Sequence, residues 1–407
     1  MNLLRVIATL DPRHGGPSAG LRAITPSLEA LGHHTTFATL DAPGRAATVP
    51  GRADLVELGP ARGGYAFAPR LEPWLRANAS RYDAVFVHGL WQHHGRVVRR
   101  TLRSTRTPYF VFPHGMLDPW FRRAYPLKHA KKWAYWQVCE RHVLRDAAAV
   151  LFTCEEERRL ARESFRPYAC RERVVAYGTA APSGNAEREI AAWRTSMPAL
   201  AARPFWLFLG RLHPKKGADL LLRAYAELGQ SATENLPSLV LAGPFSDDPY
   251  RRQLEALAAA MPPRCHVLFS GMIEGERKWG ALRSAEVFVL PSHQENFGIA
   301  VVEALAVGTP VLISRKVNIW DSIESERAGL TDTDDLAGTS RLLHRWRQSS
   351  PADRSHMQAA AAALFRQRYE IGRVAHSLVE VVSPFVHGSN APSHDVTPSR
   401  EIVRPLR

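Results

Sequence analysis

The chain has 407 residues, which is too many for one ordinary core, and its 45% hydrophobic content excludes a disordered or fibrous protein. A formal net charge of +14 favours an anionic partner, which could be nucleic acid, an anionic membrane surface or a phosphate-bearing substrate. Since the sequence carries no helix-turn-helix, zinc-finger or RNP pattern, we expect no nucleic acid.

Neither a disulfide framework nor a membrane span is predicted. The four cysteines show no C-x-x-C spacing, which fits a reduced protein and signals no metal site. No apolar run approaches the ~20 residues that cross a bilayer. The apolar start of the chain is too short for a signal peptide and reads better as a buried strand. We therefore expect a cytoplasmic protein.

The first half of the chain alternates apolar strands with helical segments, the pattern of a doubly wound α/β sheet. A strand at 3–9 leads to Gly15 and Gly16, which precede a helix at 18–31. Exposed backbone N–H groups at such a place suit an anion, although a plain turn would have the same sequence. Further strands are expected at 35–39, 84–88, 109–112 and 147–153. The glutamates that open the next helix favour its dipole.

Two neighbouring strands end in a His-Gly pair. His88 closes one strand and His114 follows the next. Open α/β sheets bind ligands at the carboxyl ends of their strands, so both histidines are candidate site residues. Asp118 lies in the same loop as His114 and is a further candidate site residue. A lone histidine at a strand end is most often only a satisfied polar residue, and that alternative remains open.

The segment 182–204 is poor in strand signals and is expected to hold the linker between an N-terminal domain at 1–185 and a C-terminal domain at 200–365. A second sheet then begins at 206–209. It leads into Gly-Arg-Leu-His-Pro-Lys-Lys-Gly, where Arg211 and Lys216 lie between a strand tip and a helix N-terminus. Basic side chains at that position can hold a diphosphate, whereas the alternative is a solvated basic loop.

The most specific stretch runs from residue 287 to residue 314. It reads as a buried strand, a polar loop with Glu295, a tight turn at Gly298, a helix and a second strand. Glu303 lies within the otherwise apolar helix. Burial of a carboxylate costs free energy unless it is hydrogen-bonded, so Glu303 either has a ligand or caps or pairs with a neighbouring group.

The Glu-x7-Glu spacing, the Asn-Phe-Gly insert and the Gly-Thr-Pro exit together resemble the donor-site signature of family-4 retaining glycosyltransferases of the GT-B fold. The resemblance covers about residues 3–382, with the specific motifs in the second half. It implies two Rossmann-like doubly wound domains facing a central cleft. It also implies a helix at 366–382 that crosses back to the N-terminal domain, and we expect a disordered tail at 383–407.

The resemblance assigns roles to the candidate residues. Glu295 would bind hydroxyls of the donor sugar, and Glu303 the nucleotide ribose. Arg211 and Lys216 would hold the diphosphate, and His114 would lie near the donor sugar. Together, His114, Arg211, Lys216 and Glu295 form the expected catalytic set. The remaining expected donor contacts are Gly15, Gly16, Ile273, Asn296, Phe297 and Gly298. His88 and Asp118 would contact the acceptor.

We expect a retaining transferase that moves a hexose from a nucleotide-diphosphate sugar to a glycan or lipid-linked sugar in exopolysaccharide or lipopolysaccharide synthesis. Cations and backbone N–H groups would stabilise the leaving group, without a metal. Asp332 and Asp334 form a D-x-D pattern, which holds a metal in the other glycosyltransferase fold; here it follows no buried strand near the donor loop and is expected to be a solvated turn. The alternatives are a GT-B nucleotide-sugar epimerase and a non-catalytic GT-B scaffold of a polysaccharide assembly complex.

The positive charge is concentrated between Arg96 and Asp146. This segment contains twelve Lys or Arg residues and only three acidic ones, with aromatic residues interleaved. Such a region fits an anionic membrane surface at the inner face of the cytoplasmic membrane, with a lipid-diphosphate-linked sugar as the acceptor. A solvated helix face with its aromatic residues in the core fits the sequence equally well.

Overall fold

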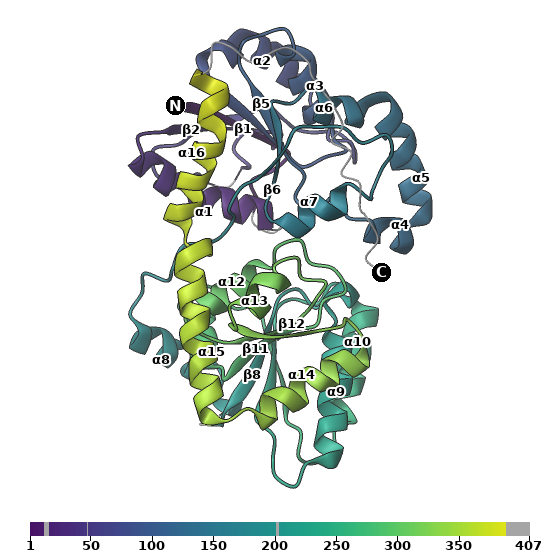
Figure 1. The fold of residues 1–407 in the computed structure, drawn as a ribbon, viewed down its shortest axis with the longest axis vertical. Coiled ribbons are helices and arrows are strands. Elements are labelled where there is room, and N and C mark those ends of the chain that lie inside the picture. Colours follow the sequence, from purple (N-terminus) through teal and green to yellow (C-terminus); the bar gives the residue numbers. More distant parts are fainter. Residues whose placement is uncertain (12–15, 47, 201–202, 388–407) are drawn as a thin grey trace, which may run out of the picture.

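The computed structural model describes residues 1–11, 16–46, 48–200 and 203–387. It forms two lobes, one above the other in Figure 1, and each is built around one β-sheet. The strands of the first lobe are β1 (Asn2–Ile7), β2 (His34–Thr39), β3 (Asp54–Glu57), β4 (Ala84–His88), β5 (Tyr109–Phe112), β6 (Ala149–Phe152) and β7 (Glu172–Val174). The strands of the second lobe are β8 (Phe205–Leu209), β9 (Ser238–Ala242), β10 (Val267–Gly271), β11 (Val287–Leu290), β12 (Val311–Ser314) and β13 (Gly329–Asp332).

Both sheets are parallel and doubly wound. The strand orders are β3-β2-β1-β4-β5-β6-β7 and β10-β9-β8-β11-β12-β13. In each sheet the next two strands of the chain lie on one side of the first strand, and the later strands lie on its other side. The strand order therefore reverses between β1 and β4 in one sheet and between β8 and β11 in the other. Ligands of such sheets bind at the carboxyl ends of the strands where the order reverses. The predicted fold class, two Rossmann-like domains, is confirmed.

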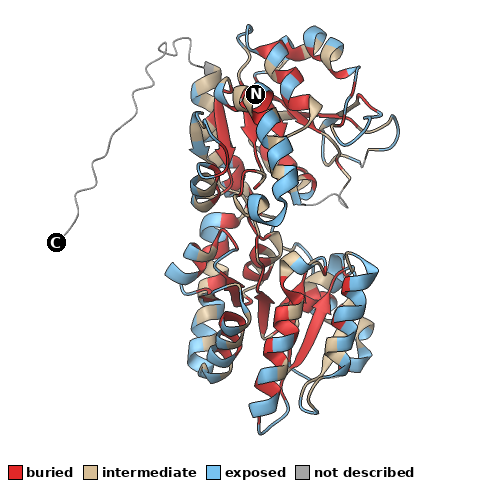
Figure 2. Ribbon diagram, turned by 90° about the vertical axis from the view of Figure 1, so that its right-hand side faces the viewer, coloured by how far each residue is buried: buried red, intermediate tan, exposed pale blue. Residues whose placement is uncertain are grey.

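Helices cover both faces of each sheet, so the central strands are buried throughout (Figure 2). The helices of the first lobe are α1 (Gly16–Ala30), α2 (Leu71–Asn78), α3 (His93–Leu102), α4 (Trp120–Ala124), α5 (Pro126–Tyr135), α6 (Arg141–Arg145) and α7 (Glu155–Ala161). Those of the second lobe are α8 (Ala186–Ser196), α9 (Ala218–Ser231), α10 (Asp248–Ala259), α11 (Gly275–Ser284), α12 (Ile299–Ala306), α13 (Trp320–Ser325), α14 (Leu336–Gln348) and α15 (Pro351–Leu364). Two π-helical turns, Trp136–Glu140 and Phe365–Tyr369, precede α6 and α16 (Ile371–His387).

The last helix, α16, starts beside the second lobe and runs along the first (Figure 1). Val374 and Leu378 of α16 belong to one apolar cluster with Ile24 and Leu28 of α1. Each such buried aliphatic side chain stabilises the fold by about 1.5–3 kcal/mol, which fixes the returning helix to the first lobe. The helix continues to His387, beyond the predicted start of the tail at 383. Residues 388–407 lie outside the described part of the chain.

The predicted linker is wrong in one respect, because α8 occupies half of 182–204. Trp193 of α8 is buried in the core of the second lobe. Arg283 of α11 donates from Nε to the buried carboxylate of Glu189, at 2.7 Å. The second lobe therefore begins with α8, and the chain crosses between the lobes before Ala186.

The strands β3, β7 and β13 are not predicted from the sequence. All three lie at sheet edges, and each is short and partly exposed. Because an edge strand has a solvated side, it lacks the apolar run that marks the central strands. Among the helices that the structure describes, none combines the length and the hydropathy of a membrane span.

Candidate active site

The carboxyl end of β8 leads into a basic loop that lies against the end of β11. Gly217 closes this loop with a φ of +70°, and a Cβ there would lie 2.3 Å from the carbonyl oxygen of Pro291. The left-handed backbone and the close approach both require glycine. The Lys-Lys-Gly sequence thereby places Lys216 beside the loop that follows β11, and α9 begins at the next residue.

Lys216 forms an ion pair with Glu295 of that loop, and the two side chains are only 21% and 18% exposed. Burial, together with the positive charges of Lys215 and Arg211, lowers the pKa of Lys216. The Glu295 carboxylate acts in the opposite direction, since a nearby negative charge favours the ammonium form. A cation and a carboxylate thus share the place where the strand order reverses.

The Glu295 loop is held by its backbone. The amide of Glu295 donates to the carbonyl of Lys316 at 2.9 Å, and its carbonyl accepts from the amide of Asn318 at 3.0 Å. Gly298, with a φ of +77°, ends the loop and starts α12. The position of Glu295 therefore does not depend on its ion pair with Lys216.

Arg211 lies at the start of the basic loop. Its side chain is exposed and has no hydrogen bond or ion pair with any residue of the described ranges. His213, two residues later, accepts the amide of Lys215 on Nδ1 at 3.0 Å. Arg211 is thus available to an anion, while its loop is fixed by a side-chain cap.

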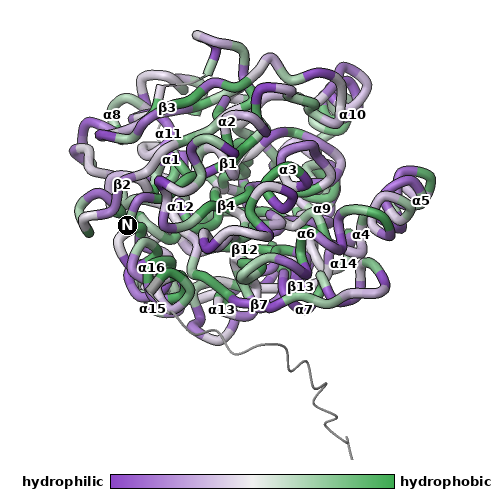
Figure 3. The backbone as a smooth tube through the Cα atoms, turned by 90° about the horizontal axis from the view of Figure 1, so that it is seen from above, coloured by the Kyte–Doolittle hydropathy of each residue, from purple (hydrophilic) through white to green (hydrophobic). Residues whose placement is uncertain are grey.

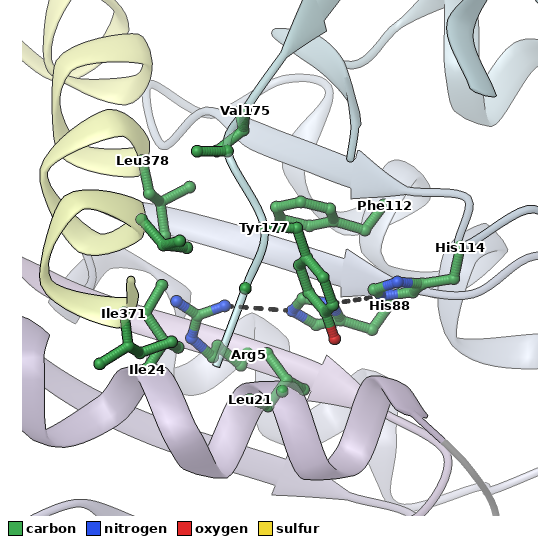
Figure 4. A pocket seen from close by; sticks show the side chains of 14 residues that line it. Arg5, Leu21, Ile24, His88, Phe112, His114, Val175, Tyr177, Ile371 and Leu378 are labelled. Carbon is green, nitrogen blue, oxygen red and sulfur yellow. Dashed lines mark hydrogen bonds between the residues drawn. The ribbon is translucent and has the colours of Figure 1, made fainter. Parts of the chain in front are cut away.

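The facing site of the first lobe is built from two histidines. His88 ends β4, His114 follows β5 with a φ of +51°, and their ring centroids are 5.4 Å apart. His88 Nδ1 lies 3.1 Å from His114 Nε2, and His88 Nε2 lies 3.5 Å from a terminal nitrogen of Arg5 (Figure 4). Burial keeps the pKa of His88 well below its usual value and lowers that of His114 to about 4, and the charge of Arg5 adds to both effects. Both rings are therefore neutral at pH 7.

The two lobes are joined across the cleft by hydrogen bonds. Gln294 Nε2 donates to Asp118 Oδ2 at 2.9 Å, and Lys215 Nζ donates to Gln294 Oε1 at 3.0 Å. Asp118 also accepts the amide of Trp120 on Oδ1 at 2.8 Å. Asp118, a predicted acceptor residue, is thereby linked through one glutamine to the basic loop of the other lobe.

A second contact across the cleft involves Asn296. Its Nδ2 donates to Thr153 Oγ1 at 3.2 Å. Gly115, next to His114, approaches Asn296 so closely that a Cβ on this glycine would lie 2.7 Å from the Asn296 Cβ. The Glu295 loop and the His114 loop therefore face each other directly.

Two family models match the chain and between them cover both lobes. The model described as Glycosyl transferase 4-like domain matches residues 15–178, and the model described as Glycosyl transferases group 1 matches residues 191–335. The chain belongs to the family-4 glycosyltransferases of the GT-B fold. The predicted family resemblance is confirmed.

The names of the relatives of this chain refer to different sugars and acceptors. Alpha-D-kanosaminyltransferase of Streptomyces kanamyceticus is 30% identical over 259 residues, which cover 61% of this chain and 62% of that protein. D-inositol 3-phosphate glycosyltransferase of Acidothermus cellulolyticus is 36% identical over 132 residues, 30% of this chain and 29% of that one. The chain thus matches less than two thirds of the length of these curated relatives.

Solved structures share the fold at low identity. Sucrose-phosphate synthase of Thermosynechococcus elongatus superposes with a TM-score of 0.71 at 20% identity, over 94% of this chain and 98% of that chain. HepE of Anabaena, in complex with UDP and glucose, gives 0.70 at 16% identity, over 94% and 99%.

Two of the predicted donor residues, Glu303 and Phe297, have partners within the protein. Glu303 of α12 forms an ion pair with Lys278 of α11, at 2.6 Å between Oε1 and Nζ. Phe297 is buried between the rings of Tyr177 and Tyr369, at 4.9 and 5.6 Å between centroids. Phe297 therefore packs between aromatic rings at the junction of the two lobes, which gives it a structural role.

The glycine pair and the expected base contact are only partly described. Gly16 is exposed and opens α1, whereas Gly15 lies outside the described residues. Ile273 is buried, at 6% exposure, just past the end of β10. Its burial leaves the backbone, and not the side chain, as the group that could contact a base.

The D-x-D segment differs from its prediction. Asp332 ends β13, which pairs with β12, and its carboxylate accepts from Arg341. Asp334 lies 3.0 Å from Nδ1 of His293, two residues before Glu295. The sequence predicted that this segment follows no buried strand and forms a solvated turn. Its first residue instead ends the partly exposed edge strand β13, which was not predicted. Among the described residues, no three His, Cys, Asp or Glu side chains converge on a point that could hold a metal ion.

Three polar residues of this site were not predicted from their motifs. Glu157 is buried, and its carboxylate accepts the amides of Gly115 and Thr153 at 2.6 and 2.8 Å, so it does more than favour a helix dipole. Gln294 gave no signal beyond its place beside Glu295. Arg5 could have been noticed as the one charge within the apolar run of β1.

Proposed function

We propose that this chain is a retaining hexosyltransferase that uses a nucleoside-diphosphate sugar as its donor. The observation that carries the proposal is the pairing of two sites across one cleft. Lys216 and Glu295 lie at the order reversal of one sheet, and His88 and His114 at that of the other. Cations suit the diphosphate, and Glu295 suits hydroxyls of the sugar. HepE, a neighbour in fold, binds UDP and glucose, which supports this class of donor.

The proposed transfer retains the configuration of the sugar. The bond between the anomeric carbon and the diphosphate oxygen breaks, and its electron pair leaves with the nucleoside diphosphate. The acceptor hydroxyl forms the new bond on the same face and gives its proton to the departing phosphate oxygen. A retaining glycosidase instead uses two carboxylates that flank the anomeric carbon. Here Glu295 and Glu303 are each paired with a lysine, which favours binding roles for both.

The departing diphosphate carries the negative charge of the transition state. We propose that Arg211 and Lys216 stabilise this charge without a metal ion, because both lie at the strand tip where the diphosphate would bind. Activity should then persist in excess EDTA. Loss of activity on chelation that is restored by Mg²⁺ or Mn²⁺ would contradict this part of the proposal.

A hairpin projects from the first lobe (Figure 3). It consists of α4, α5 and the π-helical turn after α5, and no side chain of α4 or α5 is buried. Several of its large apolar residues are exposed, with Leu127 at 87%, Val138 at 76% and Trp133 at 51%. The hairpin has no acidic residue between Asp118 and Glu140. Its basic residues are Arg122, Arg123, Lys128, Lys131 and Lys132.

Exposed Trp and Leu side chains beside basic ones are typical of a surface that binds anionic lipid. We propose that the hairpin holds the protein at an anionic membrane surface and that the acceptor is a lipid-diphosphate-linked sugar, as in exopolysaccharide or lipopolysaccharide assembly. The alternative placed these aromatic residues in the core. Trp136 is buried, as that alternative expects, but Trp133 is exposed.

Vesicle binding tests the membrane part. The double substitution Lys128→Ala and Lys131→Ala should weaken binding to anionic vesicles while donor binding stays intact, and rising salt should weaken binding by the wild type. Exposed arginines of the second lobe supply a charge-matched control, Arg252→Ala with Arg264→Ala. Equal binding to neutral and anionic vesicles would remove the membrane from the proposal.

The reaction itself is tested with a panel of nucleoside diphosphates and their sugars in thermal-shift experiments, because a ligand of the native state raises its apparent stability. The donor found in this way is then incubated with and without candidate acceptors. A transferase gives a glycosylated acceptor. Conversion of the donor sugar without any acceptor would favour the epimerase alternative, and donor binding without any turnover would favour the scaffold.

A further inference from the structure

Arg5 is a buried cation in the middle of β1. It is 1% exposed, and no carboxylate of the described ranges forms an ion pair with it. Its Nε and one terminal nitrogen have no hydrogen-bond partner among those residues. The guanidinium lies over the ring of Phe86, 5.0 Å from its centroid. An uncompensated buried charge is costly, so its presence indicates a function rather than a contribution to stability.

The cavity beside Arg5 is too small for a substrate. It has a volume of about 20 Å³, enough for one water molecule, and is closed by α1, α16 and Tyr177 (Figure 4). Any action of Arg5 on a ligand must therefore pass through a neighbouring side chain. The polar side chain within reach of its guanidinium is that of His88.

The direction of each hydrogen bond follows from the chemistry of arginine. A guanidinium only donates, so the His88 Nε2 that faces it must accept and carries no proton. A neutral His88 then has its proton on Nδ1, which faces His114 Nε2 at 3.1 Å. His114 Nε2 accepts in turn, so the proton of a neutral His114 is on Nδ1. His94 does not disturb this order, because its Nε2 faces the backbone carbonyl of His88 at 3.0 Å.

We propose that Arg5 is a positioning residue that acts through His88 to hold His114 as the Nδ1–H tautomer, so that His114 presents a hydrogen-bond donor to the nucleotide-sugar. Nδ1 of His114 has no partner among the described residues, and the next residue, Gly115, faces the Glu295 loop across the cleft. An N–H there suits an electron-rich oxygen of the sugar or its phosphate and excludes a role as a base through Nδ1.

The tautomer can be measured without any activity, which separates this inference from the proposed function on which its kinetic part rests. In protein labelled with ¹⁵N-histidine, the His114 and His88 signals are assigned with His114→Gln and His88→Asn. We expect the Nδ1–H form for both rings in the wild type and a mixture of tautomers in Arg5→Met. A proton on Nε2 of His114 in the wild type, or unchanged populations in Arg5→Met, would overturn the proposal.

Kinetics and stability supply the second test. Arg5→Met removes the buried charge, so the protein should be as stable as the wild type or more stable, while kcat falls about tenfold, the effect of one lost hydrogen bond. Arg5→Lys, which still donates, should recover part of the loss. His88→Asn keeps a donor at the position of Nδ1 and should retain more activity than His88→Leu.

A matched control is Arg171→Met. Arg171 is an exposed residue of the first lobe whose guanidinium also lies over an aromatic ring, that of Phe385, at 5.5 Å. This variant should keep wild-type kcat. If kcat of Arg5→Met fell only in proportion to a loss of stability, with the His114 tautomer unchanged, Arg5 would be a structural residue and the inference would be wrong.

Discussion

The two lobes repeat one topology, but the residues where their strand orders reverse differ in charge and exposure. In the second lobe the tips of β8 and β11 carry ionisable groups, namely the exposed Arg211 and the ion pair between Lys216 and Glu295. In the first lobe the tips of β4 and β5 carry His88 and His114, which burial keeps neutral. The same place in the fold thus offers ionic groups on one side of the cleft and neutral donors on the other.

The difference matches what each side would have to bind. A diphosphate is neutralised best by cations. The ion pair with Glu295 favours the charged form of Lys216 against the effect of burial. A sugar carries hydroxyls and no net charge, so fixed neutral groups are enough to orient it. Each prediction below perturbs one lobe and compares the result with the other.

The largest effect should come from the charged lobe. Lys216→Ala or Arg211→Ala removes a charge-assisted contact to the departing diphosphate, and we expect a loss of roughly 2–4 kcal/mol in transition-state stabilisation, measured as kcat/KM. Arg223→Ala on α9, an exposed arginine away from the loop, serves as the control. Wild-type turnover in both variants would place the diphosphate elsewhere.

The neutral lobe should instead determine the response of stability to acid. Burial lowers the pKa of His94 from 6.5 to about 4, so between these values His94 is neutral when folded and protonated when unfolded. The free energy of unfolding should therefore fall as pH drops from 6.5 to 4, by about 3 kcal/mol from this residue alone. His94→Gln, which keeps a donor for the His88 carbonyl, should reduce that fall in urea unfolding measured across this range.

The control for the acid response is His356→Gln, at an exposed position of α15. It should leave the pH dependence of unfolding as it is in the wild type. The same slope in His94→Gln as in the wild type would show that the acid response does not come from His94.

A smaller effect is expected where the lobes meet. Gln294→Ala removes both hydrogen bonds that link Asp118 to Lys215 and leaves a buried carboxylate without this partner. We expect kcat/KM to fall about tenfold and small-angle scattering to show a larger radius of gyration, because the cleft opens more often. Gln348→Ala, exposed at the end of α14, is the matched control. Unchanged scattering together with unchanged kinetics would mean that this bridge does not hold the lobes together.

The smallest effect concerns Glu303. Glu303→Gln and Lys278→Met both remove their ion pair, so both should lower the melting temperature by a similar amount. If Glu303 also binds the ribose, only Glu303→Gln should raise the KM of the donor, by about tenfold. Equal KM values in the two variants would assign the pair to stability alone.

Local sequence patterns predicted the buried central strands and the places where these strands end. The strand ends at His88, Phe112 and Leu290 follow directly from apolar runs that stop at His88 itself or at the prolines that follow Phe112 and Leu290. The edge strands β3, β7 and β13 were missed because their sequences are half polar. The helix α8 was missed because Trp193 alone does not show which core it enters.

The sequence by itself determined the doubly wound fold, the family and the order of strand, Glu295 loop and helix from residue 287 to residue 314, because these depend on apolar periodicity and on short motifs whose residues are neighbours in the chain. Only the tertiary structure decided the partners of those residues. Lys216 is 79 residues before Glu295, Arg5 is 83 residues before His88, and Asp118 is 176 residues before Gln294. The protonation of His114 and the link between the lobes depend on packing between distant segments, which no local pattern of the chain records.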